Sequence, residues 1–249
     1  MSQTFVLITG ANRGLGKGLL SRFLAQPNHT VIAANRDPEH PTSKELASLP
    51  KGEGSSLIVL KYSAEVEQDA FDIATQLHEV HGVDHLDIVI PNAGIVKQCP
   101  LVKDAKRSDI QLHFDVNTYS VVSLYQATRD LLQKSPRQKP IFAPVGSGAG
   151  TLGRQPPIPN ATYGPSKVAV AWYGIRINAE DEWLNAFVLD PGFVGTEGGK
   201  TSAGFLGFSP DALLSVDESV DGMFNVLVTA TKEKYGGKVV LYTGEVQEW

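Results

Sequence analysis

The chain opens with an apolar run that leads directly into a glycine-rich turn, FVLITGANRGLG at residues 5–16. The run has the length of a buried strand, and Gly10, Gly14 and Gly16 have the spacing TGxxxGxG ahead of a helical pattern. Glycines permit a tight turn, and backbone N–H groups at a helix N-terminus can bind a pyrophosphate. The stretch therefore predicts a strand, turn and helix that bind a nucleotide; the alternative is a glycine-rich turn without a ligand.

The remainder of the chain alternates short apolar runs with helical patterns. Continuous apolar strands joined by helices are typical of a parallel sheet that is buried on both faces. We therefore expect one α/β domain over residues 1–249, doubly wound, with helices on both sides of the sheet. The expected strands are residues 5–9, 30–34, 57–61, 86–91, 140–145, 184–189 and 238–242. The expected helices are residues 14–26, 68–80, 109–134, 163–178 and 217–230.

Two segments interrupt this alternation, residues 146–159 and 195–210, and both are expected to be long loops. Ligands in such folds bind outside the carboxyl ends of the strands, so long loops there usually carry binding residues or form lids. Phe205, Leu206 and Phe208 are candidate lid residues, with simple core packing as the alternative.

Composition excludes several classes of protein. The net charge is −5, and no basic stripe of the kind that binds nucleic acid is present. No stretch approaches the roughly 20 apolar residues of a membrane span, and the N-terminus does not resemble a signal peptide. Cys99 is the single cysteine, and no histidine spacing typical of a metal site occurs. We expect a cytoplasmic protein without a metal, a membrane or a nucleic acid as partner.

Two arginines indicate which nucleotide binds. A carboxylate about 20 residues after the glycine turn would bind the ribose of NAD, whereas an arginine accommodates the 2′-phosphate of NADP. Arg36 follows the second expected strand, and Arg13 lies in the glycine turn. Asn35 supplies no carboxylate that would repel a phosphate, although Asp37 could pair with Arg36 at the surface. We expect NADP(H) as the cofactor.

The candidate catalytic residues lie in the second half of the chain. Tyr163 and Lys167 are four residues apart, so they share one helix face, where the cation favours the phenolate. Such a pair is common by chance, and an ordinary surface pair is the alternative. Ser147 follows the fifth expected strand, where its hydroxyl could polarise a carbonyl. Asn117 lies among apolar neighbours in a helix, where an unpartnered amide is costly.

These motifs together resemble one family over essentially the whole chain. TGANRGLG, PNAG at 91–94, Asn117, Ser147, YGPSK at 163–167 and DPGFVGT at 190–196 resemble the short-chain dehydrogenase/reductase family. The resemblance implies a Rossmann fold with a seven-stranded parallel sheet and a catalytic set of Asn117, Ser147, Tyr163 and Lys167. Within the family, residues 183–199 and 230–240 and the terminal Trp249 resemble the norsolorinic acid ketoreductase group of fungal polyketide pathways.

The resemblance also implies a role for each residue of the catalytic set. Tyr163 would be the general acid and base, and Ser147 would orient the carbonyl. Lys167 would bind the nicotinamide ribose and lower the pKa of Tyr163, while Asn117 would hold a water of a proton relay. Val194 and Thr196 would contact the nicotinamide. The expected cofactor-binding residues are Gly10, Asn12, Arg13, Gly14, Leu15, Gly16, Asn35, Arg36, Ser63, Asn92, Ala93, Gly94, Tyr163, Lys167, Pro191, Gly192, Val194 and Thr196.

Three positions depart from the family pattern. Pro91 replaces an asparagine, Ser63 replaces an aspartate that often contacts adenine, and residues 154–159 are extra. We expect an NADPH-dependent ketoreductase for a hydrophobic, aromatic polyketide-like carbonyl compound. The alternatives are a catalytically silent NADP(H)-binding regulator or scaffold, and an enzyme that oxidises the corresponding alcohol. By resemblance, the chain would form a homodimer or homotetramer through the helices at 109–134 and 163–178.

Overall fold

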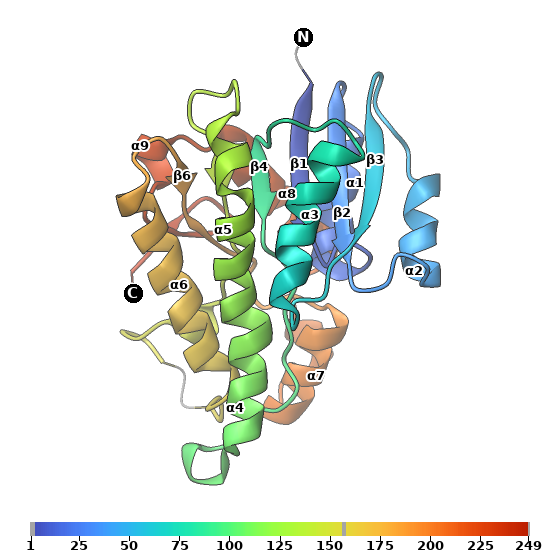
Figure 1. The fold of residues 1–249 in the computed structure, drawn as a ribbon. Coiled ribbons are helices and arrows are strands. Elements are labelled where there is room, and N and C mark those ends of the chain that lie inside the picture. Colours follow the sequence, from blue (N-terminus) through green and yellow to red (C-terminus); the bar gives the residue numbers. More distant parts are fainter. Residues whose placement is uncertain (1–2, 156–157, 249) are drawn as a thin grey trace.

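A computed structural model describes residues 3–155 and 158–248, and a parallel sheet of six strands lies at its centre (Figure 1). The strand order is β3-β2-β1-β4-β5-β6. The strands are β1 (Thr4–Thr9), β2 (His29–Asn35), β3 (Ser56–Lys61), β4 (Ile88–Ile90), β5 (Ile141–Phe142) and β6 (Asn185–Ala186). The order reverses at β1, where Ile8 pairs with Ala33 of β2 on one side and Ile90 of β4 on the other. This reversal opens the crevice in which doubly wound folds bind ligands.

The expectation of seven strands in one sheet was wrong, because the strand expected at residues 184–189 belongs to two sheets. Phe187 N donates to Phe142 O (3.3 Å), whereas Val188 N donates to Lys238 O on the opposite side (2.9 Å). β7 (Val188–Asp190) therefore pairs with β8 (Val239–Leu241), and β9 (Val246–Gln247) adds an antiparallel edge. The strand expected at residues 238–242 forms as β8, but it lies in a separate sheet of three strands.

Helices cover both faces of the sheet, as Figure 1 shows with α3, α5 and α6 in front and α1 and α8 behind. One core cluster joins buried residues of α1 and α8 to one face, and a second joins those of α3, α5 and α6 to the other. The doubly wound fold is confirmed. The helices are α1 (Gly14–Leu24), α2 (Pro41–Lys44), α3 (Glu67–Glu79), α4 (Arg107–Phe114), α5 (Ser120–Gln133), α6 (Tyr163–Glu180), α7 (Glu197–Leu206), α8 (Val216–Thr229) and α9 (Lys232–Tyr235).

The helix expected at residues 109–134 has the expected extent but is interrupted. A π-helical turn at Asp115–Tyr119 separates α4 from α5. At the end of this turn, the Ser120 hydroxyl donates to Val116 O at 2.6 Å. Single π turns occur mostly at functional sites, and this one carries Asn117.

The loop expected at residues 195–210 is mostly a helix, α7. Thr196 caps its N-terminus by accepting a hydrogen bond from Gly199 N at 3.1 Å, and Gly207 ends it at φ 71°. These two caps offset the low helix propensity of the glycines between them. The other expected loop, residues 146–159, contains only a short 3-10 turn at Gly148–Gly150 among its described residues, and Pro156 and Pro157 lie outside them.

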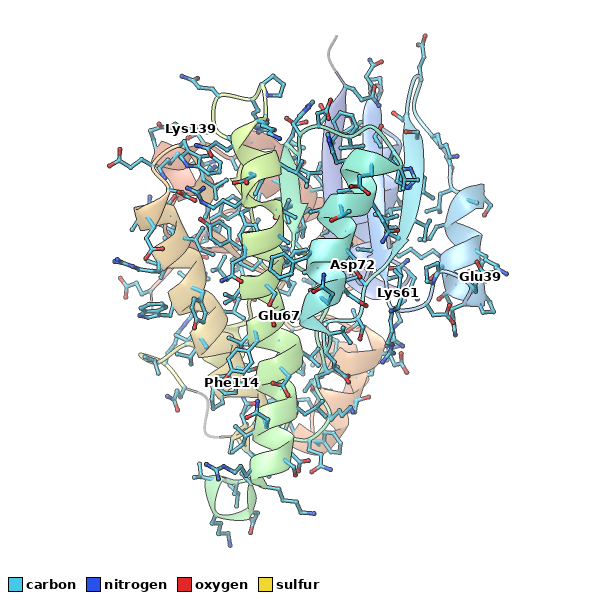
Figure 2. The ribbon with its side chains drawn as sticks, viewed as in Figure 1. Glu39, Lys61, Glu67, Asp72, Phe114 and Lys139 are labelled. Atoms are coloured by element: carbon cyan, nitrogen blue, oxygen red, sulfur yellow. The ribbon has the colours of Figure 1, made fainter. Side chains whose placement is uncertain are left out.

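Charged side chains cover the outside of the helical layers. Figure 2 shows Glu67 and Asp72 on the exposed surface of α3 and Glu39 beside α2. Near the other end of the front layer, Lys139 Nζ donates to Glu182 O at 2.9 Å. Among the described residues, no helix combines the length and the apolarity that crossing a membrane requires.

Candidate active site

A cavity of about 950 Å³ lies at the carboxyl ends of the parallel strands. It is bounded by the loops that follow β1, β2, β3, β4, β5 and β7, because parallel strands bring these loops to one edge. The expected residues that line it are Gly10, Asn12, Arg13, Gly14, Leu15, Arg36, Ser63, Asn92, Ala93, Gly94, Ser147, Tyr163, Lys167, Pro191, Gly192, Val194 and Thr196. The other expected residues, Gly16, Asn35 and Asn117, lie behind this lining.

The glycine turn after β1 is shaped as nucleotide binding requires. Gly10 and Gly14 have φ values of +62° and +53°, a region that favours glycine. At Gly16, a Cβ atom would lie 2.3 Å from Gly10 O, so the turn and α1 pack without room for a side chain. Among the residues that the structure describes, no side chain caps the N-terminus of α1. Its first N–H groups can therefore hold a phosphate, and the turn fits a dinucleotide.

Hydrogen bonds join this turn to the loop after β4. Thr9 Oγ1 accepts from the backbone nitrogens of Asn92 (3.0 Å) and Ala93 (2.9 Å). The Asn92 side chain returns a hydrogen bond to Thr9 O (2.9 Å). The two loops that flank the crevice are therefore held as one unit.

Asn35 is the last residue of β2 and Arg36 follows it, and the two side chains have different environments. Asn35 is 1% exposed, and its Oδ1 accepts from Ala11 N at 2.8 Å, so it supports the glycine turn from beneath. Arg36 is exposed and lines the cavity, where its guanidinium can reach a 2′-phosphate. Arg13 lies at the cavity lip, and its Nη1 is 2.5 Å from Glu197 Oε2 of α7.

Tyr163 begins α6, and Lys167 follows one turn later on the same face. The Lys167 ammonium lies 5.7 Å from the centre of the Tyr163 ring and donates to Val145 O at 2.8 Å. Ser147, on the loop after β5, lines the same cavity as Tyr163, and its hydroxyl accepts a hydrogen bond from Ala149 N at 3.2 Å. The structure thus brings the phenol, the hydroxyl and the ammonium together in the cavity, although 16 residues separate Ser147 from Tyr163 in the sequence.

Burial controls the proton affinity of the Tyr163 phenol and of the Lys167 ammonium. Desolvation raises the pKa of Tyr163 to about 12, although the nearby Ser147 hydroxyl acts in the opposite direction. Desolvation lowers the pKa of Lys167 to about 8, and the charge of Asp190 opposes that decrease. The sequence predicted that Lys167 would lower the pKa of Tyr163. In this structure the pKa is instead raised, because desolvation has the larger effect. Near neutral pH the site holds a phenol, which can donate a proton, beside an ammonium.

The Asn117 amide binds protein groups rather than the cavity. Its Oδ1 accepts from Ile95 N (2.8 Å), while its Nδ2 donates to Ile95 O (3.0 Å) and Ser166 Oγ (3.1 Å). With both N–H groups engaged, the amide holds the loop after β4 against α6. The role in a proton relay stays a prediction.

Sequence reasoning did not name Cys99, Asp190 and Phe193 as members of the site, although all three line the cavity. Asp190 and Phe193 lie in the motif DPGFVGT, which was their signal, and Cys99 has no such signal. Ile158, which also lines the cavity, belongs to the extra residues 154–159.

The candidate lid residues divide between the cavity and the surface. Leu206 and Phe208 line the cavity, whereas Phe205 is 54% exposed and does not. The Phe193 and Phe208 rings are 5.9 Å apart, edge to face, so the outer part of the cavity is aromatic. Within the described residues, no cluster of three or more His, Cys, Asp or Glu side chains could hold a metal ion.

Comparisons with known proteins agree with this geometry. The family model described as short chain dehydrogenase matches residues 4–206. A norsolorinic acid ketoreductase of Dothistroma septosporum is 37% identical over 243 residues, which cover 96% of this chain and 90% of that protein. One from Aspergillus parasiticus is 36% identical over 97% of this chain and 89% of that protein. The NADPH-bound carbonyl reductase from chicken fatty liver has a TM-score of 0.87 and 25% identity, with both chains fully covered.

Proposed function

The chain belongs to the short-chain dehydrogenase family and is an NADP-dependent oxidoreductase, and we propose that it reduces a carbonyl group with Tyr163 as the proton donor. The observation that carries this proposal is the position of the Tyr163 ring, 5.7 Å from the Lys167 ammonium, in the cavity that Ser147 also lines. Burial keeps this phenol protonated at neutral pH, as a proton donor must be.

The residues divide the work between the cofactor and the substrate. NADPH, when bound, supplies the hydride. The glycine turn and α1 hold its phosphates, Arg36 binds the 2′-phosphate, and Lys167 binds the nicotinamide ribose. Ser147 orients the carbonyl oxygen toward the Tyr163 hydroxyl, which donates its proton to that oxygen as the alkoxide develops. Asn117 keeps the wall of the site in place through Ile95.

The substrate is proposed to be a hydrophobic, aromatic polyketide-like ketone. Phe193, Leu206 and Phe208 give the outer cavity apolar surfaces on which a flat ring can stack. Two similar fungal proteins carry the name norsolorinic acid ketoreductase, which supports a substrate of this class.

The reverse reaction is the main alternative, and it needs a phenolate as the base. The raised pKa of Tyr163 makes that form scarce near neutral pH, whereas reduction uses the phenol that prevails there. A silent NADP(H)-binding protein would not require the Tyr163 phenol, the Ser147 hydroxyl and the buried Lys167 ammonium to meet in one cavity. Assembly into a dimer or tetramer stays a prediction; exposed Tyr119 of the π turn and Trp172 of α6 are available for such a contact.

The test is the consumption of NADPH with a panel of aromatic ketones. Tyr163→Phe should abolish turnover and leave NADPH binding nearly unchanged, because only the hydroxyl is removed. Tyr173→Phe, on the same helix but outside the cavity lining, is the matched control and should retain parental turnover. Turnover by Tyr163→Phe within about tenfold of the parent would refute the assignment, since general acid catalysis contributes more than that.

A further inference from the structure

Asp190 is a buried carboxyl group beside the proposed catalytic residues. It ends β7, is 3% exposed and lines the cavity. Gly146 N donates to Leu189 O at 2.9 Å, which places the end of β7 next to the loop that carries Ser147. The proposed proton donor, its ammonium neighbour and this carboxyl group therefore share one cavity.

The two oxygens of Asp190 have different surroundings. Oδ1 accepts a hydrogen bond from Gly192 N at 2.9 Å, which fixes the carboxyl group against its own loop. Oδ2 faces the other way, 3.4 Å from the position that a Cβ of residue 148 would occupy. Because residue 148 is glycine, it places no side chain against Oδ2, and the carboxyl group faces the Ser147 turn.

Lys167 needs a negative charge nearby. It is 6% exposed, its ammonium donates to the neutral Val145 O, and within the described residues it forms no direct ion pair. A buried ammonium without a counter-charge is strongly disfavoured and tends to lose its proton. The carboxylate whose charge acts on Lys167 is Asp190.

We propose that Asp190 is a positioning residue whose negative charge holds the protons on Lys167 and Tyr163, the state from which carbonyl reduction starts. A negative charge favours an ammonium and disfavours a phenolate, so one carboxylate acts on both groups in the same sense. The inference rests on the proposed function only for its catalytic consequence, because the effect on Lys167 exists without any substrate.

The directions of the pKa shifts agree with this geometry. The Asp190 charge raises the pKa of Tyr163 and opposes the decrease in the pKa of Lys167. Burial raises the pKa of Asp190 itself, whereas the Gly192 N–H and the charges of Arg154 and Lys167 favour its ionised form.

Other titratable groups face the same space. Cys99, from the loop after β4, adds to the increase in the Tyr163 pKa. His113 of α4 lies 6.4 Å from the Tyr163 ring, centre to centre, and its ring nitrogens contact Asp109 O (2.7 Å) and Lys97 N (3.3 Å). A neutral imidazole satisfies both contacts, because Nδ1–H donates to Asp109 O and Nε2 accepts from Lys97 N. Glu65 and Glu197 also line the cavity, but both are exposed, whereas Asp190 is a buried carboxyl group.

The first measurement is a titration of Lys167 by NMR, using lysine labelled with carbon-13 and assigned with Lys167→Arg. The parent should titrate near pH 8. Asp190→Asn keeps an acceptor for Gly192 N and removes the charge, so its midpoint should fall by about 0.5–1 unit. Asp190→Glu should stay near the parent. Glu79→Gln removes an exposed charge at the end of α3 and should leave the midpoint unchanged.

The outcomes separate this inference from the proposed function. An unchanged midpoint in Asp190→Asn would overturn the inference, including the case in which Asp190 is already neutral. If Asp190→Asn does not fold, Asp190→Ser removes the same charge and retains a hydroxyl for Gly192 N. With a reducible ketone, the alkaline limb of the rate profile should shift by the same amount, and the rate near pH 8 should fall about two- to fivefold. A shifted midpoint without any ketone reduction would support the role of Asp190 and refute the proposed function.

Discussion

Arg36 is the residue on which the choice between NADPH and NADH depends. It lies at the end of β2, where it is exposed and lines the cavity. In the described part of the chain it forms no ion pair, and the neighbouring Asp37 instead accepts a hydrogen bond from Glu39 N at 2.9 Å. The surface pair that could have neutralised Arg36 is therefore not formed, and its guanidinium is available to a 2′-phosphate.

The size of the effect follows from the hydrogen bonds that the guanidinium can donate to the phosphate. A hydrogen bond to a charged group contributes about 1.5–3 kcal/mol, and each 1.4 kcal/mol changes affinity about tenfold. Arg36→Ala should therefore weaken NADPH binding roughly ten- to a hundredfold and barely change NADH binding. Arg13 also lines the cavity, and its exposed pair with Glu197 is worth only about 0–1 kcal/mol. Arg13 can therefore offset part of the loss, which favours the lower end of this range.

Isothermal titration of both nucleotides into the parent and Arg36→Ala measures this difference. Arg176→Ala is the matched control, because Arg176 is exposed on α6, pairs with Glu180 at 2.7 Å and does not line the cavity. Equal losses for NADPH and NADH would show that the substitution damages the site generally. No loss for either nucleotide would show that Arg36 does not contact the phosphate.

Two further predictions concern the glycine turn and pH. Gly16→Ala places a Cβ against Gly10 O, so urea unfolding should show a loss of about 1–3 kcal/mol together with weaker NADPH binding. Gly204→Ala meets no atom of the described residues within 4 Å and should be neutral or stabilising; equal stability of the two variants would contradict the described packing. Lys167 has a pKa of about 8, so its positive charge is present below that pH and lost above it. We therefore expect kcat/KM for reduction to fall as the pH rises through 8. A flat pH profile would contradict a role for the Lys167 charge in reduction.

The local features of the fold could be predicted from the sequence because short segments determine them. The first strand, the glycine turn and α1 follow one another along the chain, and the pattern of apolar residues and glycines indicates all three. α7 could not be predicted in this way, because its glycines indicate a loop. Only the capping by Thr196 and Gly207 distinguishes it from one. The division between β6 and β7 likewise depends on which neighbouring strand each backbone N–H group reaches.

In the candidate site, the sequence likewise could not show which individual polar residues face the cavity. The sequence indicates Asn35 and Asn117 as polar residues of the site, and both prove to hold loops rather than line the cavity. Their partners, Ala11 and Ile95, are 24 and 22 residues away in the sequence, so spacing alone could not reveal those hydrogen bonds. A sequence motif identifies which polar groups meet at a strand edge, but the backbone decides which of them face the ligand.

Asp37 and Asp190 show that the position of a carboxyl group in the fold determines how strongly its charge acts on neighbouring groups. Asp190 is the first residue of the motif DPGFVGT, whereas Asp37 adjoins Arg36, and the sequence drew attention to Asp37 because it could pair with that arginine. Asp37 is exposed to water, which screens its charge, whereas Asp190 is 3% exposed, so its field reaches neighbouring groups with little screening. Burial, which the sequence does not display for a single polar residue, therefore distinguishes Asp190 from Asp37 as the carboxyl group whose charge acts on the Tyr163 phenol.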